Sequence, residues 1–424
     1  MSSMHDRFAA AAMLFLLACP TPAQETAASA KKHSLADLVS LASKTTPLLA
    51  AQDARVEERT LSADQARVWE GPSAAFLLGR KSEPAGSGPS WDLSASVPLP
   101  LTGEPGLRGR RIDLEAEAWR VQREASELLV TAAVAQGAFE YAASRRKAVF
   151  AESRRKRFEL IQSYLEGRVF PTPQRKAESR IVANQLKNLA AEAIQSEAGA
   201  RSSLQKLRTY LPFGPEETPE VEVPWLSGAR RLDEKEWLDK GLTSNPELRI
   251  QRLAVREAGL DRTLASREGL PDASLVASYE RAKAAETEKT YGVGLSLAFP
   301  AWNGNRSAVK SADKKKLAEE RQLGFAEQKL KAALLHTLVE YEAARKIASE
   351  YTPATLAELE SQLKAADEGF SRGQVDLLTF LELDGSAAET FARALDAQTN
   401  LASKAGELFA LTADRDAVAK LASF

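Results

Sequence analysis

The chain has 424 residues and is almost neutral, with 57 Lys and Arg against 58 Asp and Glu. A balance of this kind gives no general attraction for nucleic acid, so we expect no nucleic-acid partner. It contains one cysteine, Cys19, which excludes a disulfide framework within the chain. Past the first residues only His33 and His336 remain, so one copy cannot assemble a soft-metal cage, and we predict no metal and no cofactor.

The first residues have the composition of an export signal. Arg7 precedes the apolar run "FAAAAMLFLLAC" (8–19), which is too short for the roughly 30 Å core of a bilayer. Two processing routes remain open. A signal peptide at 1–23 would give a mature start near Gln24, whereas "LLAC" resembles a bacterial lipobox, with a lipoprotein signal at 1–18 and a lipidated Cys19. Either route predicts an exported protein, soluble or in an outer membrane.

The chain contains two related halves. Pro47 matches Pro246 and Pro72 matches Pro271, with the same offset of 199 residues. Each half runs through a helix, two short alternating stretches, a very long helical segment, a glycine break and another helix. A proline-rich segment at 211–225 joins them. We therefore predict a first repeat at 24–226 and a second at 227–424.

The long helical segments predict an elongated molecule. They run from about Arg108 to Glu166 and from about Arg306 to Phe370, with Pro353 as the one intruding proline. Some 60 helical residues make a rod of about 90 Å, which does not fit a compact domain. Alanines recur at helical spacing over 128–143 and would let neighbouring helices approach closely. Helices alone would also suit a soluble periplasmic coiled coil.

Four short strands are expected in two hairpins, at 73–99 and 273–300. Their ranges are Ser73–Lys81, Trp91–Leu99, Ala273–Arg281 and Tyr291–Pro300. In each strand an apolar set alternates with a small or polar set, as in "TYGVGLSLAF" (290–299), which is typical of transmembrane barrel strands. Polar connections at 82–90 and 282–289 fit hairpin tips. The alternative is two amphipathic hairpins on a globular core.

Four strands cannot close a barrel, and open edges in lipid leave backbone groups unpaired. Several copies must therefore share one barrel, whose glycine and serine face would line an aqueous channel. The predicted fold is mainly α with a small β part. Long coiled-coil hairpins would form a trimeric α-barrel, and four strands from each protomer would enter a 12-stranded β-barrel.

These features resemble the TolC-like outer-membrane efflux proteins over nearly all of the mature chain. The most specific likeness is a pair of helix breaks, "YLEGRVFPTPQRKAESR" (164–180) and "GFSRGQVDLLTFLELDGSA" (369–387), in matching places of the two halves. The turns at 98–111, 167–180 and 299–309 are similar to those of the CzcC-like heavy-metal branch, although Phe170 stands where a serine is usual.

The resemblance implies a homotrimer in outer-membrane lipid. A periplasmic adaptor and an inner-membrane transporter, of the resistance-nodulation-division type, would dock at the tunnel's tip. It also implies roles for residues at the two tips, near 167–174 and 371–378. The implied adaptor contacts are Gly167, Val169, Gly373, Val375 and Leu377, and the candidate pore-constriction acids are Asp376, Glu382 and Asp384. These acids also fit an ordinary solvated helix face.

The expected function is a passive exit duct without catalysis, because no nucleophile and base, phosphate loop or ligand cluster stands out. Its cargo would be metal cations or small toxic molecules. Two alternatives remain open at this stage. One is a periplasmic coiled-coil protein without a pore. The other is the exit duct of a type I protein or peptide secretion system, which would use the same architecture.

Overall fold

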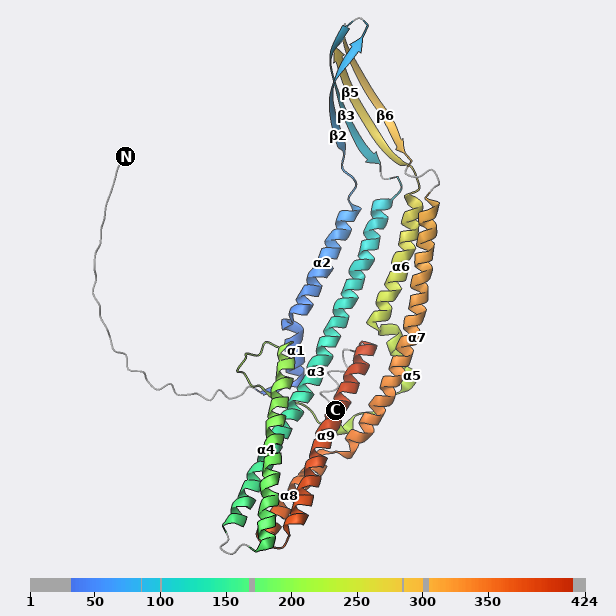
Figure 1. Cartoon of the computed structure of the whole chain (residues 1–424). Coiled ribbons are helices and arrows are strands. Elements are labelled where there is room, and N and C mark those ends of the chain that lie inside the picture. Colours follow the sequence, from blue (N-terminus) through green and yellow to red (C-terminus); the bar gives the residue numbers. More distant parts are fainter. Residues whose placement is uncertain are drawn as a thin grey trace, which may run out of the picture.

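The computed structural model describes residues 32–84, 86–99, 101–167, 172–283, 286–299 and 305–414. The expected export signal, Cys19 and Val169 lie outside these ranges. The described chain is elongated, with one β-sheet at one end and long helices running away from it (Figure 1). A mainly helical chain with four main strands confirms the predicted fold class.

The sheet consists of β2 (Ser73–Glu83), β3 (Gly86–Leu99), β5 (Asp272–Lys283) and β6 (Thr287–Ala298). All neighbours are antiparallel in the order β2-β3-β5-β6, so the hairpin from each half lies beside the other. The strands continue into the segments expected to be loops, and the connections are therefore shorter than predicted. Near the tip, a Cβ on Gly88 would lie 1.8 Å from the carbonyl oxygen of Lys283, so only glycine allows this close approach of β3 and β5.

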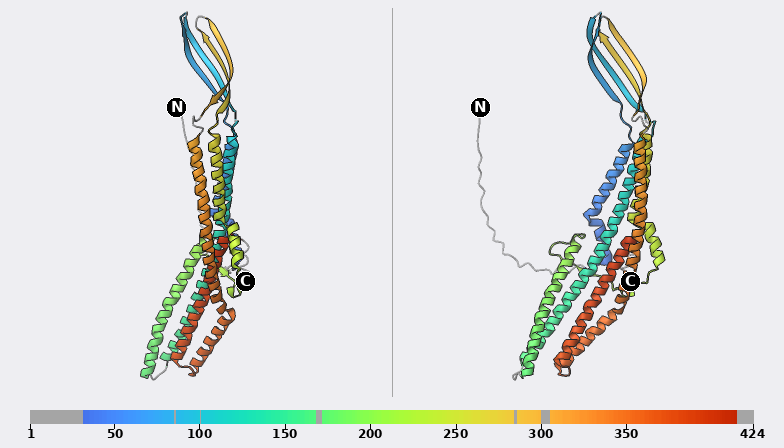
Figure 2. Two further views of the ribbon diagram at one scale, coloured as in Figure 1. Left: turned by 90° about the vertical axis from the view of Figure 1, so that its right-hand side faces the viewer. Right: turned by 45° about the vertical axis from the view of Figure 1, so that its right-hand side comes forward.

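The first half supplies four helices: α1 (Leu35–Thr45), α2 (Pro47–Arg67), α3 (Glu104–Glu166) and α4 (Pro173–Arg208). Pro47 opens α2 and Pro173 opens α4, where the missing amide of proline costs no helical hydrogen bond. α3 has 63 residues, about 95 Å at ~1.5 Å per residue, and runs from the sheet nearly to the opposite end of the molecule (Figures 1 and 2).

The second half supplies α5 (Glu234–Ser244), α6 (Pro246–Arg267), α7 (Arg306–Glu350), α8 (Pro353–Ser371) and α9 (Leu377–Thr412). Its long segment is two helices because Pro353 cannot donate a backbone hydrogen bond within a helix. The side chain of Thr352 accepts from the amide of Thr355 and caps the restarted helix α8. Elements of similar length recur in the two halves: α1 and α5 both have 11 residues, and α4 and α9 both have 36.

The helices share two apolar cores. The larger lies at mid-height, where α3, α7 and α9 meet α1, α5 and the connection between the halves, and it includes Leu38, Val134, Leu334 and Leu408. There β1 (Lys32–Ser34) pairs in parallel with β4 (Glu220–Glu222), and the short helix η1 (Leu226–Gly228) follows. The smaller core lies in the lower part of the helices and includes Phe158, Leu189, Ala366 and Phe380.

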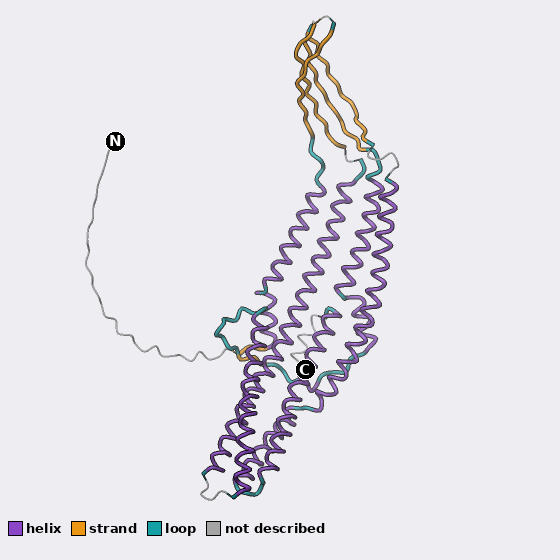
Figure 3. The backbone as a smooth tube through the Cα atoms, in the orientation of Figure 1, coloured by secondary structure: helices purple, strands orange, loops and turns teal. Residues whose placement is uncertain are grey.

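Helices dominate the backbone between the two ends, as Figure 3 shows. None of those within the described ranges combines the length and the low polarity that a membrane-crossing helix requires.

Candidate functional site

One face of the sheet is apolar from β2 to β6. The register aligns Phe76, Leu93, Tyr279 and Tyr291 in one row, and Trp91 packs between the aromatic rings of this row. Nearer the helices, the same face carries alanine, valine and leucine. Many of its side chains are exposed in the single chain; for example, Val293 is 82% exposed. A continuous apolar face of this kind needs lipid or protein to cover it.

The opposite face carries small and polar side chains. Successive rows across the sheet are Ser73, Ser96, Val276 and Gly294, then Ala75, Ser94, Ser278 and Gly292. A Cβ on Gly294 would meet no atom within 4 Å, so the space in front of this face is open. Small side chains thus leave room for passage along the face.

The two outermost strands of the sheet, β2 and β6, each have one neighbour among the described residues. Their other edges present unpaired backbone amides and carbonyls, which are costly to leave unpaired in lipid. The sheet of one chain is therefore an incomplete unit.

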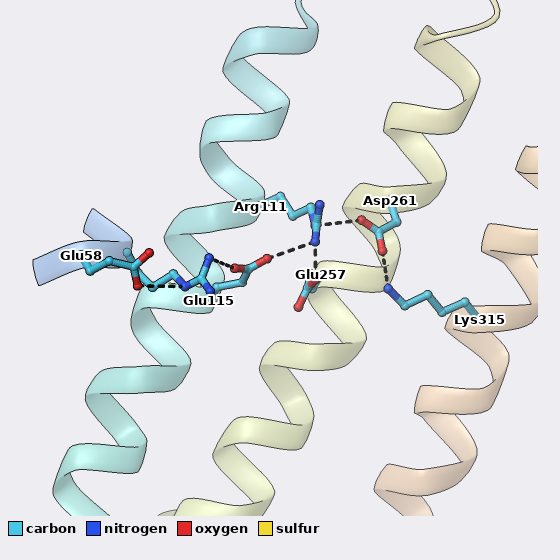
Figure 4. Close-up of polar contacts among 7 residues, drawn as sticks. Glu58, Arg111, Glu115, Glu257, Asp261 and Lys315 are labelled. Carbon is cyan, nitrogen blue, oxygen red and sulfur yellow. Dashed lines mark hydrogen bonds and ion pairs between the residues drawn. The ribbon is translucent and has the colours of Figure 1, made fainter. Parts of the chain in front are cut away.

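Directly beneath the sheet, an ion-pair chain crosses four helices (Figure 4). Arg111 of α3 lies 3.1 Å from Glu115 on its own helix and 3.2 Å from both Glu257 and Asp261 of α6. Asp261 continues the chain to Lys315 of α7 at 2.6 Å. Glu115 extends it in the other direction to Arg59 of α2 at 3.3 Å.

This chain of charges links the first half of the molecule to the second. Burial disfavours the charged form of Arg111, but the surrounding carboxylates outweigh it and raise its pKa. The hydrogen bond to Asp261 likewise raises the pKa of Lys315. Both groups therefore stay charged at neutral pH, and the network fixes the spacing of the helices that carry the two hairpins.

The second tip is a tight turn between α8 and α9. Gly373 has φ of +75°, a conformation that side chains other than glycine rarely adopt. The amides of Gln374 and Val375 both donate to the carbonyl of Gly369. Gly167 at the first tip has φ of −71° in the helical region, so the backbone requires glycine at Gly373 and does not require it at Gly167.

The three candidate acids have different surroundings. Asp376 caps α9 by accepting from the amide of Thr379 at 2.7 Å, and this hydrogen bond lowers its pKa. Glu382 is exposed and makes no hydrogen bond or ion pair with another described residue. Asp384 is 1% exposed and accepts from Arg154 at 2.6 and 3.1 Å, between α9 and α3. Its charge is already balanced inside the protomer.

The tip residues expected to contact an adaptor also differ in their exposure. Val375 is half-buried against the lower core, and Leu377 is 6% exposed within that core. The neighbouring Leu378 is 67% exposed and takes the outward position that was expected for Leu377. Because successive residues of a helix point about 100° apart, the sequence pattern near a helix start does not identify the outward leucine.

Among the described residues, no three His, Cys, Asp or Glu side chains lie close enough together to hold a metal ion. The acids discussed above are instead partners of arginine and lysine, a helix cap, or single exposed groups.

Residues 237–414 match the family described as "Outer membrane efflux protein". Solved structures share the fold. CusC has a TM-score of 0.70 and 14% identity, covering 89% of this chain and 91% of its own. A membrane protein from Pseudomonas aeruginosa has a TM-score of 0.69 and 16% identity, covering 89% and 92%. The CmeC outer membrane channel of Campylobacter jejuni has a TM-score of 0.67 and 14% identity, covering 89% and 85%. No curated protein sequence matches the chain.

The match over residues 237–414, in the second half of the chain, and the shared fold of these channels both agree with the TolC-like resemblance drawn from the sequence. The two-faced sheet on a long helical body is the architecture that the chain shares with them.

Proposed function

We propose that the chain forms a passive outer-membrane exit duct of a tripartite efflux system. The observation that carries the proposal is the four-stranded sheet. It is apolar on one face and small or polar on the other, and each of its two outer strands has a free edge. It stands at the end of a helical body whose longest helix, α3, is about 95 Å long. No catalytic step is involved, since a duct only provides a path.

Three copies satisfy the edges of the sheet. If β6 of each copy pairs with β2 of the next, every backbone group at those edges gains a partner, and twelve strands enclose an opening. The face with Gly294 and Ser278 then lines the opening, while the face with Tyr291 and Val293 contacts lipid. The helices beneath the sheet extend the duct into the periplasm.

The partners follow from the family resemblance and from the shape of the tips. A periplasmic adaptor would contact the turns near Gly167 and Gly373, with Val375 and the exposed Leu378 as its apolar contacts, and an inner-membrane pump of the resistance-nodulation-division type would supply the energy. Val169, outside the described residues, stays in this proposal from its place in the sequence. Leu377 is withdrawn because it packs inside the protomer.

Metal cations or small toxic molecules remain the proposed cargo, in line with the CzcC-like turns of the sequence. A type I protein or peptide secretion duct would use the same architecture. Co-purification of the protein with its native pump separates these proposals, because a resistance-nodulation-division transporter and an ATP-driven exporter differ in composition.

The constriction is proposed to involve Glu382 and Asp376. Threefold symmetry would place three copies of Glu382 in one ring and favour cations over anions. Asp384 is left out because Arg154 balances its charge. Changing Glu382→Lys should lower the cation selectivity of the pore without changing assembly. The reversal potential across a salt gradient measures this, and an unaltered value would return Glu382 to a solvated helix face.

Cys19 is proposed either to carry a lipid at the mature N-terminus, as its lipobox-like setting indicates, or to be removed with a signal peptide at 1–23. Mass spectrometry of the mature N-terminus separates the two routes. A diacylglycerol-modified Cys19 would establish lipidation, and a start near Gln24 would establish removal.

Single-channel recording in planar bilayers tests the duct itself. The mature protein should give discrete conductance steps and run as a heat-modifiable trimer. A monomer that is fully extracted by carbonate and gives no conductance would favour the periplasmic coiled coil without a pore.

A further inference from the structure

The charges of the sheet are divided between its two faces. Side chains alternate along a strand, so the register assigns each one to a face. The small-residue face holds five acids and one base: Glu83, Asp92, Asp272, Glu280, Glu288 and Lys81. The apolar face holds four bases and no acid within the described strands: Arg80, Arg281, Lys283 and Lys289. We call these four residues the outer basic belt.

Within the part of the chain that the structure describes, no acid pairs with the outer basic belt. Arg281 of β5 lies directly opposite Lys289 of β6, and like charges in such a pair destabilise a sheet. All four side chains are exposed. Among the described residues the belt makes no ion pair, and its side chains make one hydrogen bond, which Arg80 donates to the hydroxyl of Ser87 at 3.1 Å. The acids of the opposite face point away from it.

The belt lies just beyond an aromatic row. Ring centroids are 6.2 Å apart for Phe76 and Trp91, 5.0 Å for Trp91 and Tyr279, and 4.9 Å for Tyr279 and Tyr291. Aromatic residues of this kind mark the boundary between hydrocarbon and headgroups. Arg281 is two residues beyond Tyr279 and Lys283 is four, so the belt begins about 7 Å and ends about 13 Å farther along the strand.

We propose that the outer basic belt binds the phosphate groups of a phosphorylated glycolipid in the outer leaflet of the outer membrane. This proposal rests on the proposed placement of the sheet in that membrane. The belt is at headgroup depth, is positively charged only, and offers an arginine fork that matches phosphate geometry. A second copy of this chain does not fit the belt, because its corresponding face carries the same positive charges.

The lipid neutralises a repulsion that the protein builds into its own sheet. Fatty chains of the same molecule would lie against the aromatic row and the alanine, valine and leucine side chains below it. The acids lie on the small-residue face and the bases on the apolar face. Positive charge therefore binds lipid outside the barrel, and negative charge faces the channel.

Native mass spectrometry of the full mature protein in detergent tests the proposal, with added diphosphorylated lipid A as the probe. The wild-type protein should bind it, and dephosphorylated lipid A should bind at least about tenfold more weakly. The variant with Arg281→Gln, Lys283→Gln and Lys289→Gln should lose phosphorylated lipid A to a similar extent. Lys81→Gln removes one base from the same sheet end on the inner face and should retain it. Inorganic phosphate should not displace the lipid.

Equal binding of the phosphorylated and dephosphorylated lipids would overturn the proposal, as would unchanged binding by the triple variant. The comparison of the two lipids uses the wild-type protein, so it decides the proposal even if the triple variant fails to fold. Conductance of the same preparations separates the two levels of inference. Normal channels without phosphate-dependent lipid binding reject the outer basic belt alone, whereas absent channels and trimers reject the proposed duct with it.

Discussion

The sheet and the helices of one chain differ in how far they bury their apolar side chains. In the helical body, Leu38 and Leu334 are 0% exposed and pack in a core that one protomer builds by itself. In the sheet, Leu78 is 76% and Tyr291 is 75% exposed, and both lie on a face that the protomer leaves uncovered. Apolar side chains therefore have different surroundings: other side chains in the helices and, in the proposed duct, lipid at the sheet.

This difference separates two kinds of stability. Burial in the helical body is complete within one chain, so substitutions there should change unfolding of the protomer. In the proposed trimer the sheet depends on sister copies and lipid, so substitutions there should change assembly or passage and leave helical unfolding nearly unaltered. The following variants test this division, beginning with the largest expected effect.

Blocking the inner face of the sheet should have the largest effect. Gly294 has open space where its side chain would be, so Gly294→Trp fits the fold but places three indoles in the trimeric opening. Single-channel conductance should fall by more than half, while helical unfolding stays as in the wild type. Val293→Trp is the matched control, because Val293 points to the opposite face. Equal conductance in both variants would contradict the assignment of the faces.

Breaking the buried ion pair should have the largest effect on stability. Asp384→Ala leaves Arg154, whose side chain is 4% exposed, with the half-exposed Glu192 as its remaining partner at 3.0 Å, and the loss should be about 2–3 kcal/mol. Thermal unfolding followed by circular dichroism at helical wavelengths measures it. Asp396→Ala removes an acid that is 68% exposed beside Lys147, and such surface pairs contribute about 0–1 kcal/mol. Similar melting of the two variants would show that Asp384 is not buried in the assembly.

The two helical tips offer a smaller and symmetric comparison. Gly373→Ala forces a side chain into a left-handed conformation and should cost about 1–2 kcal/mol. Gly167→Ala stays in the helical region and meets the carbonyl of Ser163 at 3.3 Å, so it should be nearly neutral. Thermal unfolding compares them, and an equal loss in both would mean that assembly imposes the same turn on both tips.

The smallest effect concerns pH at the second tip. The hydrogen bond from the Thr379 amide lowers the pKa of Asp376 below its usual 3.8. A lowered pKa in the folded state gives stabilisation that is full above the unfolded pKa and disappears as pH falls through the folded one. Acidification below about pH 4 should therefore loosen the start of α9, measured by amide hydrogen exchange at Thr379. Asp376→Asn should show a weaker dependence on pH, and an unchanged dependence would reject this cap as its source.

The sequence predicts the sheet well because its signal is local. Alternation in "TYGVGLSLAF" assigns each residue to a face, and the structure keeps that assignment from β2 to β6. The strand ends were predicted too short, since polar residues such as Lys283 continue a strand as readily as they form a turn. The aromatic row was missed as a unit because it depends on the register of four strands.

The tip was harder to predict because its residues depend on distant partners. Asp384 meets Arg154 across 230 residues of sequence, and no periodicity within α9 indicates that contact. Leu377 and Leu378 are adjacent and chemically identical, yet one packs inside and the other is exposed. Which of them turns outward is decided by how α9 lies on α3 and α8, and that is a property of the tertiary structure.

The short connections of the two hairpins limit where the proposed duct could be closed. β2 ends at Glu83 and β3 begins at Gly86, while β5 ends at Lys283 and β6 begins at Thr287. Two and three residues are too few to fold back across an opening, so the protein's own turns cannot cap the exit that faces the cell's surroundings. In the proposed duct, a valve would then have to operate at the far end of the helices.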